Sequence, residues 1–368
     1  MANDRINLLG MPQAALEALF IEFGEKAFHA RQLMRWVYQR GVTDFEEMTD
    51  LSKSLRRKLE DETSIELPEV LSQHDSEDGT IKWLFESGFG QAVEAVFIPE
   101  PDRGTLCISS QVGCALDCAF CATGAQGFNR NLSAAEIIGQ VWHANQALPR
   151  RDNDAADFAV TNVVFMGMGE PLANYRNVVP AIEVLISDLA YGISHRRVTV
   201  STSGLVPNMD KLGDECNVSL AVSLHAPNDD LRDELVPINK MHPIEKLLDA
   251  CWRYAGKRTN RHITFEYVML DGVNDSLAHA DQLGALLRNR PAKVNLIPFN
   301  PFAGNEYRRS PADTILDFQN RLRQHGLVAT TRKTRGEDIN AACGQLAGKV
   351  SDRVRNRLSE KRRRVATA

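Results

Sequence analysis

Three closely spaced cysteines are the strongest chemical signal in the sequence. Cys114, Cys118 and Cys121 form a C-x3-C-x2-C pattern, with the aromatic Phe120 directly before the last cysteine. Three thiolates on one short loop can hold a metal centre, whereas a disulfide would leave one of them unpaired. A structural zinc site takes four ligands, and a [4Fe–4S] cluster normally takes four thiolates. The triplet alone therefore fits a cluster with one open iron, part of a zinc site, or buried structural thiols.

A second group of residues that could do chemistry follows short apolar runs along the chain. Glu170, in Met-Gly-Met-Gly-Glu-Pro, can accept hydrogen bonds from an ammonium group. Gly169 before it lets the backbone approach a ligand closely. The residues after later apolar runs are Ser201, Ser223, Leu224, His225 and Asn300. Each turn alone is a weak signal, but all of them at one edge of a sheet would form a site.

The elements that must position these residues alternate between strand-like and helix-like runs. We predict strands at 106–110, 160–165, 198–201, 218–224, 263–270 and 294–298. We predict helices at 134–148, 175–189, 244–255, 277–288 and 313–325, the first with a capping box from Ser133 and Glu136. Repeated β-then-α units predict a parallel sheet with right-handed crossovers. The sequence thus predicts an α/β fold, a partial (βα)6 TIM-like barrel with its chemistry on the loops after the strands.

Four segments are expected along the chain. Helical spacing of apolar residues predicts a small helical accessory domain over residues 1–75, and β-rich runs predict a β-hairpin linker over 76–105. The barrel would span 106–350, and a basic tail 351–368. In the linker Glu94 lies mid-strand among apolar neighbours, which by spacing alone indicates an outward-facing residue. We expect Cys216 and Cys251 to be structural, because free cysteine packs as a small hydrophobe.

Composition excludes several classes of protein. The chain of 368 residues has a net charge of −5, which is not the charge of a protein that coats nucleic acid. No run approaches the ~18 apolar residues that a membrane span needs, and the N-terminus lacks the apolar region of a signal peptide. We therefore expect a cytoplasmic protein with no membrane partner, in which seven cysteines stay reduced and free to ligate metal.

The motifs together resemble a known family. The cysteine loop, with an aromatic residue before its last cysteine, resembles the cluster loop of the radical S-adenosylmethionine (SAM) superfamily. Further motifs are Asn-Arg-Asn-Leu-Ser-Ala-Ala-Glu-Ile, Met-Gly-Met-Gly-Glu-Pro, Val-Ser-Leu-His-Ala-Pro and Ala-Ala-Cys-Gly-Gln-Leu. With the cysteine loop they are similar to the radical SAM RNA methyltransferases of the RlmN and Cfr family. The similarity runs from roughly residue 10 to 350.

The resemblance implies the cofactors and their ligands. Cys114, Cys118 and Cys121 would hold a [4Fe–4S] cluster whose open iron binds SAM. Gly169 and Glu170 would meet the SAM amino group. The other residues of the cofactor pocket would be Ser201, Ser223, Leu224, His225 and Asn300.

The resemblance also implies a reaction, the methylation of carbon-2 of an adenine in 23S rRNA and of the adenine 3′ of the anticodon in some tRNAs. One SAM would methylate Cys343, and a second would yield a radical that activates this methyl group for addition to the ring. Glu94 would be the general base that removes the ring proton. Cys107 would then attack the sulfur of Cys343, releasing the methylated base and leaving a disulfide. The expected partners are rRNA, tRNA, an external electron donor and a disulfide reductant, and the protein is expected to be a monomer.

Two alternatives stay open. Methylation of carbon-8 of the same rRNA adenine, as Cfr performs it, would use the same set of cysteines. A non-enzymatic zinc or Fe–S RNA-binding protein would use them structurally, with closed four-ligand coordination. The basic residues of the N-terminal helices and of the tail are either a solvated surface or contacts to RNA backbone.

Overall fold

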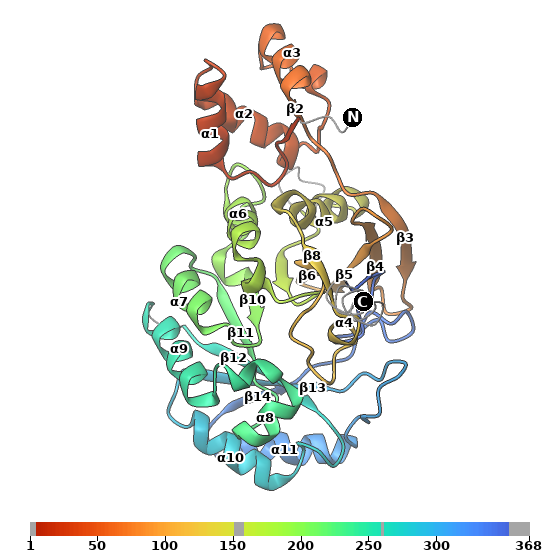
Figure 1. Ribbon diagram of the computed structural model, residues 1–368, viewed down its shortest axis with the longest axis vertical. Helices are drawn as coiled ribbons and strands as arrows, with labels where there is room; N and C mark the ends of the chain where they lie inside the picture. Colours follow the sequence, from red (N-terminus) through yellow and green to blue (C-terminus); the bar gives the residue numbers. More distant parts are fainter. Residues whose placement is uncertain (1–4, 151–157, 259–260, 353–368) are drawn as a thin grey trace, which may run out of the picture.

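The computed structural model describes residues 5–150, 158–258 and 261–352. At the N-terminal end, helices stand apart from the main sheet (Figure 1). The elements of this region are β1 (Ile6–Asn7), α1 (Gln13–Glu22), α2 (Phe28–Met34), η1 (Arg35–Gln39), η2 (Phe45–Glu47), α3 (Lys53–Glu62) and β2 (Thr63–Ser64). Strands β1 and β2 pair in parallel and so join the two ends of the region. The Ser52 side chain caps α3 by accepting from the Leu55 amide.

A parallel sheet forms the centre of the molecule. Its strands are β6 (Arg103–Cys107), β9 (Asn162–Phe165), β10 (Val198–Thr202), β11 (Ser219–Ser223), β12 (Ile263–Met269), β13 (Ala292–Pro298) and β14 (Val328–Thr331). They pair in chain order, each parallel to the next. The predicted barrel of parallel βα units is confirmed, and all six predicted strands are present. Strand β14 was not predicted, because most of its residues are exposed and it shows no apolar run.

The hairpin region is part of the same sheet and not a separate linker. Strands β3 (Val70–Asp75), β4 (Ile81–Glu86) and β5 (Ala92–Glu100) are antiparallel, and β5 pairs with β6 in the register Val96 to Cys107. Within the described residues the order is therefore β14-β13-β12-β11-β10-β9-β6-β5-β4-β3. The barrel wall continues without a break into the strand that carries Glu94.

Helices cover the outer face of the sheet (Figure 1). They are α5 (Ala134–Ala147), α6 (Tyr175–Ile186), α7 (Val206–Glu215), α8 (Asp229–Leu235), α9 (Ile244–Gly256), α10 (Leu277–Leu287) and α11 (Ala312–Gln324), with the 3-10 turns η4 (His195–Arg197) and η5 (Pro237–Lys240). The predicted helices coincide with α5, α6, α9, α10 and α11, and the capping box of Ser133 and Glu136 is present. Helices α7 and α8, which are short and rich in charge, were not predicted.

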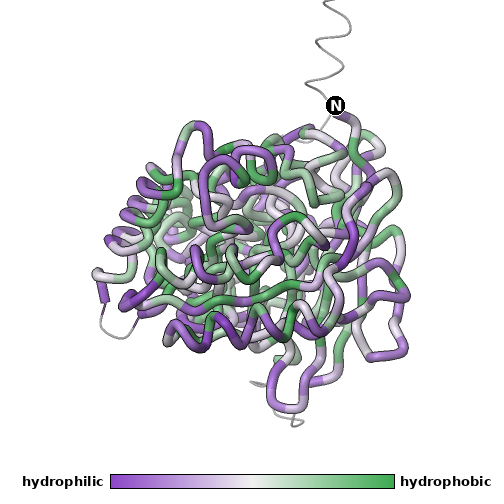
Figure 2. Tube along the Cα trace, turned by 90° about the horizontal axis from the view of Figure 1, so that it is seen from below, coloured by the Kyte–Doolittle hydropathy of each residue, from purple (hydrophilic) through white to green (hydrophobic). Residues whose placement is uncertain are grey.

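The apolar core lies between the sheet and these helices. Hydrophobic segments run through the middle of the chain trace, and hydrophilic segments gather at its outer turns (Figure 2). Cys216 ends α7 and Cys251 lies inside α9, both buried, which agrees with structural roles. Among the described residues, no helix is long and apolar enough to cross a membrane.

A buried arginine on α8 ties the ends of β10 and β11 together. Arg232 donates to the carbonyl oxygens of Ser203 (2.7 Å), Ser223 (3.1 Å) and Leu224 (3.1 Å) and to the side chain of Asn239 (2.8 Å). Burial lowers the pKa of Arg232 to about 10, so the guanidinium remains charged at neutral pH. Its fork of donors fixes the loops that follow two neighbouring strands.

Replacing this arginine should be costly. Arg232→Met leaves buried carbonyl oxygens without donors, so we expect the free energy of unfolding to fall by at least ~3 kcal/mol. Arg253→Met, which breaks the exposed ion pair with Asp210, should cost less than ~1 kcal/mol. Urea unfolding of both variants measures the difference, and equal losses would contradict the tying role of Arg232.

Candidate active site

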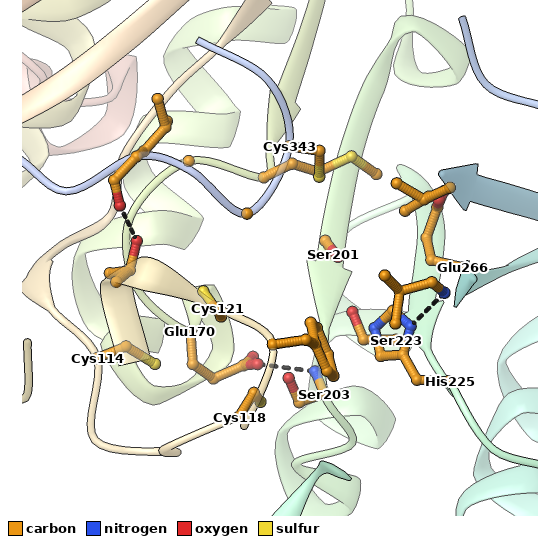
Figure 3. A pocket seen from close by; sticks show the side chains of 18 of the residues that line it. Cys114, Cys118, Cys121, Glu170, Ser201, Ser203, Ser223, His225, Glu266 and Cys343 are labelled. Atoms are coloured by element: carbon orange, nitrogen blue, oxygen red, sulfur yellow. Dashed lines mark hydrogen bonds between the residues drawn. The ribbon is translucent and has the colours of Figure 1, made fainter. Parts of the chain in front are cut away.

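A cavity lies where the carboxyl ends of the parallel strands meet. The predicted site residues in its wall are Cys114, Cys118, Cys121, Gly169, Glu170, Ser201, Ser223, His225, Asn300 and Cys343. The cluster-type cysteines and Glu170 lie on one side of it, opposite Ser223 and His225 (Figure 3). Leu224, Cys107 and Glu94 are not among the lining residues. Leu224 is instead fully buried, and its carbonyl oxygen accepts from Arg232.

A short ribbon positions the cysteine loop. Strands β7 (Gln111–Gly113) and β8 (Phe128–Asn131) pair in antiparallel fashion, and the Cys114 amide donates to the Gly127 carbonyl at 2.8 Å. Cys121 precedes the single turn α4 (Ala122–Ala125), and its amide donates to the Cys118 carbonyl at 3.1 Å. The chain thus turns back on itself twice, so that all three thiols reach the cavity.

The three thiols of the loop form a donor set that could hold a metal centre. All are free, and desolvation raises the pKa of Cys114 to about 12 and that of Cys118 well above its usual value. A bound cationic centre would compensate for ionising them. Among the described residues, no three His, Cys, Asp or Glu side chains are grouped to hold one ion.

Glu170 is a buried carboxylate that faces the cavity. It precedes η3 (Pro171–Asn174) and accepts from the amides of Leu172 (3.0 Å) and Ser203 (2.8 Å). Burial raises its pKa to about 7, although these hydrogen bonds oppose the shift. Gly169 has φ +101°, and a Cβ there would lie 2.5 Å from the side chain of Gln111, so glycine is required. None of the ion pairs among the described residues involves Glu170, and an ammonium group would supply one.

His225 offers a hydrogen-bond donor across from Glu170. Its Nδ1 accepts from the Val268 amide at 3.0 Å, and burial lowers its pKa to about 3. The ring is therefore neutral with its proton on Nε2. Phe120 packs edge-on against it, with ring centroids 4.4 Å apart. This side of the cavity combines an aromatic surface with polar groups, as a nucleoside would require.

Cys343 lies in a loop after β14. Asn300 donates to its carbonyl oxygen at 3.0 Å. Desolvation raises its pKa, and the nearby guanidinium of Arg332 opposes that shift. Cys107, at the end of β6, has its pKa raised to about 12 by burial and then by Cys343, so the two thiols are close enough to interact.

Two further residues of the site were missed in the sequence. Arg332 directly follows β14 and interacts electrostatically with Cys343, Cys107 and Glu266. Glu266 is buried in β12, and its carboxylate accepts from the Asn295 side chain at 2.8 Å. An acidic residue inside the apolar run Ile-Thr-Phe-Glu-Tyr-Val-Met was a signal that could have been used for Glu266. The sequence offers no comparable signal for Arg332.

A second cavity, of about 700 Å³, extends from Cys343 through the inside of the barrel. Cys343, Arg332, Glu266 and Asn300 line both cavities. The basic residues in the wall of the second cavity are Arg103, Arg196, Lys293, Arg332, Lys333 and Arg335, against the acidic Glu100 and Glu266. This excess of cations in a chain of net charge −5 favours an anionic occupant.

Glu94, the predicted base, is held outside both cavities. Its carboxylate lies 3.1 Å from the Lys82 ammonium and accepts from the Ala347 amide at 2.9 Å. It is buried and not outward-facing, which contradicts the interpretation from spacing alone. Its role as a base remains a prediction.

Comparison with known proteins identifies the family. Residues 6–65 match the model of the ribosomal RNA large subunit methyltransferase N-terminal domain, and residues 108–283 match the radical SAM superfamily. Proteins named dual-specificity RNA methyltransferase RlmN, from Francisella tularensis subsp. novicida and subsp. holarctica, are each 56% identical over 356 residues, which cover 96% of this chain and 96% of theirs. The chain belongs to the RlmN family of radical SAM methyltransferases.

A solved structure supports the same assignment. The crystal structure of a radical SAM methyltransferase from Sphaerobacter thermophilus is 45% identical and superposes with a TM-score of 0.85, covering 93% of this chain and 99% of that one. The resemblance drawn from the motifs is therefore confirmed. RlmN family membership implies SAM and a [4Fe–4S] cluster as cofactors, and the cavity has a donor set suited to both.

The cysteine triplet should determine cluster content. Protein purified and reconstituted without oxygen should contain about four irons and four sulfides per chain. Cys114→Ala, Cys118→Ala and Cys121→Ala should each lose the cluster, whereas Cys216→Ala, which changes a buried cysteine elsewhere, should retain it. Iron and sulfide analysis checks this, and a colourless wild-type protein with one bound zinc would contradict it.

Glu170 should control SAM affinity and its pH dependence. A carboxylate–ammonium contact contributes roughly 1.5–3 kcal/mol, so Glu170→Gln should weaken SAM binding about tenfold or more with the cluster retained. Wild-type affinity should rise as pH rises through about 7, where the raised pKa lets the carboxyl ionise, and the variant should lack this rise. Equilibrium dialysis with labelled SAM measures both, and equal affinities would show that the turn is only structural.

Proposed function

We propose that this enzyme methylates carbon-2 of an adenine in 23S rRNA and of the adenine 3′ of the anticodon in some tRNAs. The observation that carries the proposal is the position of Cys343 in the wall shared by a cavity suited to SAM and a basic cavity suited to a nucleotide. The curated relatives are named dual-specificity RNA methyltransferases, which supports RNA as the substrate class.

The substrate explains why a cysteine relay is needed. Carbon-2 of adenine is electron-poor and carries no acidic proton, so it cannot displace a methyl group from SAM as an amine does. When bound, the cluster and SAM supply the methyl group and a 5′-deoxyadenosyl radical. We assign the three loop cysteines as the cluster ligands, and Gly169 and Glu170 to the SAM amino group. Ser201, Ser223, His225 and Asn300 line the rest of this pocket, and Leu224 contributes its backbone.

Cys343 is the methyl carrier in this proposal. Its thiol lies in the cavity wall, and the charge of Arg332 favours the thiolate that must accept the methyl group. After hydrogen abstraction, its S–CH2 carbon bonds to carbon-2 of the base, which joins protein and RNA covalently. The loop position of Cys343 allows the sulfur to serve first the methyl donor and then the base.

Two residues resolve the adduct. Glu94 accepts the ring proton. Cys107 attacks the sulfur of Cys343 as its thiolate, so that an S–S bond forms and the S–C bond breaks with its electron pair on the product carbon, which takes up a proton to complete the methyl group. The unpaired electron that the radical addition leaves on the ring would pass to a one-electron acceptor, which the cluster would supply when bound. The electrostatic coupling of the two thiols supports this pairing. The disulfide must then be reduced from outside, and an external electron donor serves the cluster, so we propose a cytoplasmic enzyme.

RNA contacts beyond the target base are assigned to the N-terminal segment, for which we propose the bounds 1–75. Its exposed lysine and arginine residues are Lys26, Arg31, Arg35, Arg40, Lys53 and Arg57. Arg56 is buried against Glu46 and is structural. The hairpin 76–105 and the barrel 106–350 complete the proposed organisation. Most of the basic tail, from residue 353, lies outside the described residues.

The two working cysteines should fail differently when replaced. Cys343→Ala has no methyl carrier, so it should cleave SAM without ever attaching to RNA. Cys107→Ala can still load, abstract and add, but it cannot break the thioether, so it should stall with RNA bound through Cys343. Denaturing gels with and without RNase reveal the adduct, and nucleoside mass analysis with 2-methyl and 8-methyl standards identifies the product.

Three results would contradict the assignment. Normal turnover by Cys107→Ala would remove its role in resolution, and an adduct in Cys343→Ala would remove the methyl-carrier role. An 8-methyl product from the wild type would replace carbon-2 by carbon-8 as the site of methylation.

A further inference from the structure

A single ion pair braces both ends of the loop that carries Cys343. Lys82, on β4, donates to the Asn340 carbonyl at 3.3 Å and lies 3.1 Å from Glu94, on β5. The other oxygen of Glu94 accepts from the Ala347 amide at 2.9 Å. The contacts from Asn340 to Lys82, from Lys82 to Glu94 and from Glu94 to Ala347 therefore connect the two ends of the loop that carries Cys343.

The Lys82–Glu94 ion pair, which we call the brace, is buried, and backbone hydrogen bonds fix the position of the chain beside it. The side chains of Lys82 and Glu94 are only 11% and 12% exposed, so solvent screens their attraction little. Beside it, Ala92 and Lys349 exchange backbone hydrogen bonds of 2.8 and 2.9 Å. Gly348 permits this approach, because a Cβ there would lie 2.3 Å from the Ala92 carbonyl oxygen. The segment that carries Cys343 thus packs directly against β5, the strand that carries Glu94.

Other hydrogen bonds of the loop join neutral groups. The carbonyl of Gly344 accepts from the Ala122 amide at 2.9 Å, and that of Leu346 accepts from the Thr123 hydroxyl at 2.6 Å. Asn300 holds the Cys343 carbonyl in the same way. Proton transfer to Glu94 leaves these bonds unchanged. It removes the Coulomb attraction between Lys82 and Glu94, so the brace responds to the chemistry of the base.

We propose that Lys82 is a positioning residue that couples the base to the methyl-carrier loop. The proposal rests on the function given above. When the base removes the ring proton, the C–H bond of the adduct breaks, the proton joins a carboxylate oxygen of Glu94, and the electron pair stays on the ring. The neutral carboxyl then holds Lys82 and Ala347 less firmly, and the loop loosens at the step where Cys107 must reach Cys343.

The brace also accounts for where Glu94 lies. In this state the carboxylate is outside both cavities, held by Lys82 and Ala347.

Step-resolved assays of the full-length, cluster-loaded enzyme test the coupling. Lys82→Met should load Cys343 from methyl-labelled SAM in the absence of RNA as the wild type does. With RNA it should accumulate the Cys343 adduct roughly tenfold above the wild type, because Glu94 without Lys82 is no longer held in position to take the ring proton that must leave before resolution. Lys82→Arg should restore most of the resolution. The matched control is Lys257→Met, which removes a lysine that also pairs with a carboxylate, Asp214, and reaches the Asp210 carbonyl, far from the site.

Hydrogen exchange tests the brace without turnover. Peptides covering residues 340–349 should exchange faster in Lys82→Met and in Glu94→Gln than in the wild type, and Lys257→Met should leave them unchanged. Iron content and the melting temperature show whether each variant is folded. If Lys82→Met destabilises the protein, Lys82→Arg and Glu94→Gln still report on the brace through exchange.

The outcomes separate this proposal from the function on which it rests. A wild type that never methylates Cys343 or never forms an adduct overturns the proposed function. A wild type that does both, with Lys82→Met resolving the adduct and exchanging like Lys257→Met, overturns the brace alone. Slow methyl loading in Lys82→Met without RNA would also overturn it, because the effect would then precede proton transfer.

Discussion

Buried ionisable side chains that have no oppositely charged partner among the described residues govern the functional centre of this protein. An ionised side chain in a low-dielectric interior is costly unless a charge or hydrogen bonds compensate it. Glu170 accepts two backbone hydrogen bonds but pairs with no cation among the described residues, and burial raises its pKa to about 7. Desolvation raises the pKa of the Cys114 thiol to about 12 and that of the Cys118 thiol well above its usual value. The ionised forms of these buried groups therefore lack a compensating positive charge. A cationic metal centre beside the thiols and an ammonium group beside Glu170 would supply it.

The wall between the two cavities is where cofactor and substrate chemistry meet. Cys343 is part of that wall, and Glu266 on β12 and Arg332, the residue after β14, contribute to it as well. A sulfur in this position can be reached from either side without crossing the molecule. The surrounding charges differ on the two sides, with acidic and thiol groups toward the cofactor pocket and arginine and lysine groups toward the barrel interior.

Continuity of the sheet explains how distant segments act on one sulfur. Strand β5 pairs directly with β6, so Glu94 and Cys107 belong to neighbouring strands of one wall. The segment after β14, at the other edge of the sheet, returns to dock on β5 through Ala92 and Lys349. The loop that carries Cys343 therefore connects the β14 edge of the sheet with β5.

Local sequence determined much of the fold and part of the site. The capping box of Ser133 marked the start of α5, and the cysteine spacing marked the cluster loop, because both depend on a few neighbouring residues. Helices α7 and α8 and strand β14 could not be predicted, since they are short, polar or exposed. Only the tertiary structure decided that Glu94 pairs with Lys82 and with an amide 253 residues away, that Arg332 lies beside two thiols, and that Leu224 points into the core. These contacts depend on how far a sheet of many strands curves, and that curvature is a sum over the packing of the whole chain and not a property of any one stretch of it.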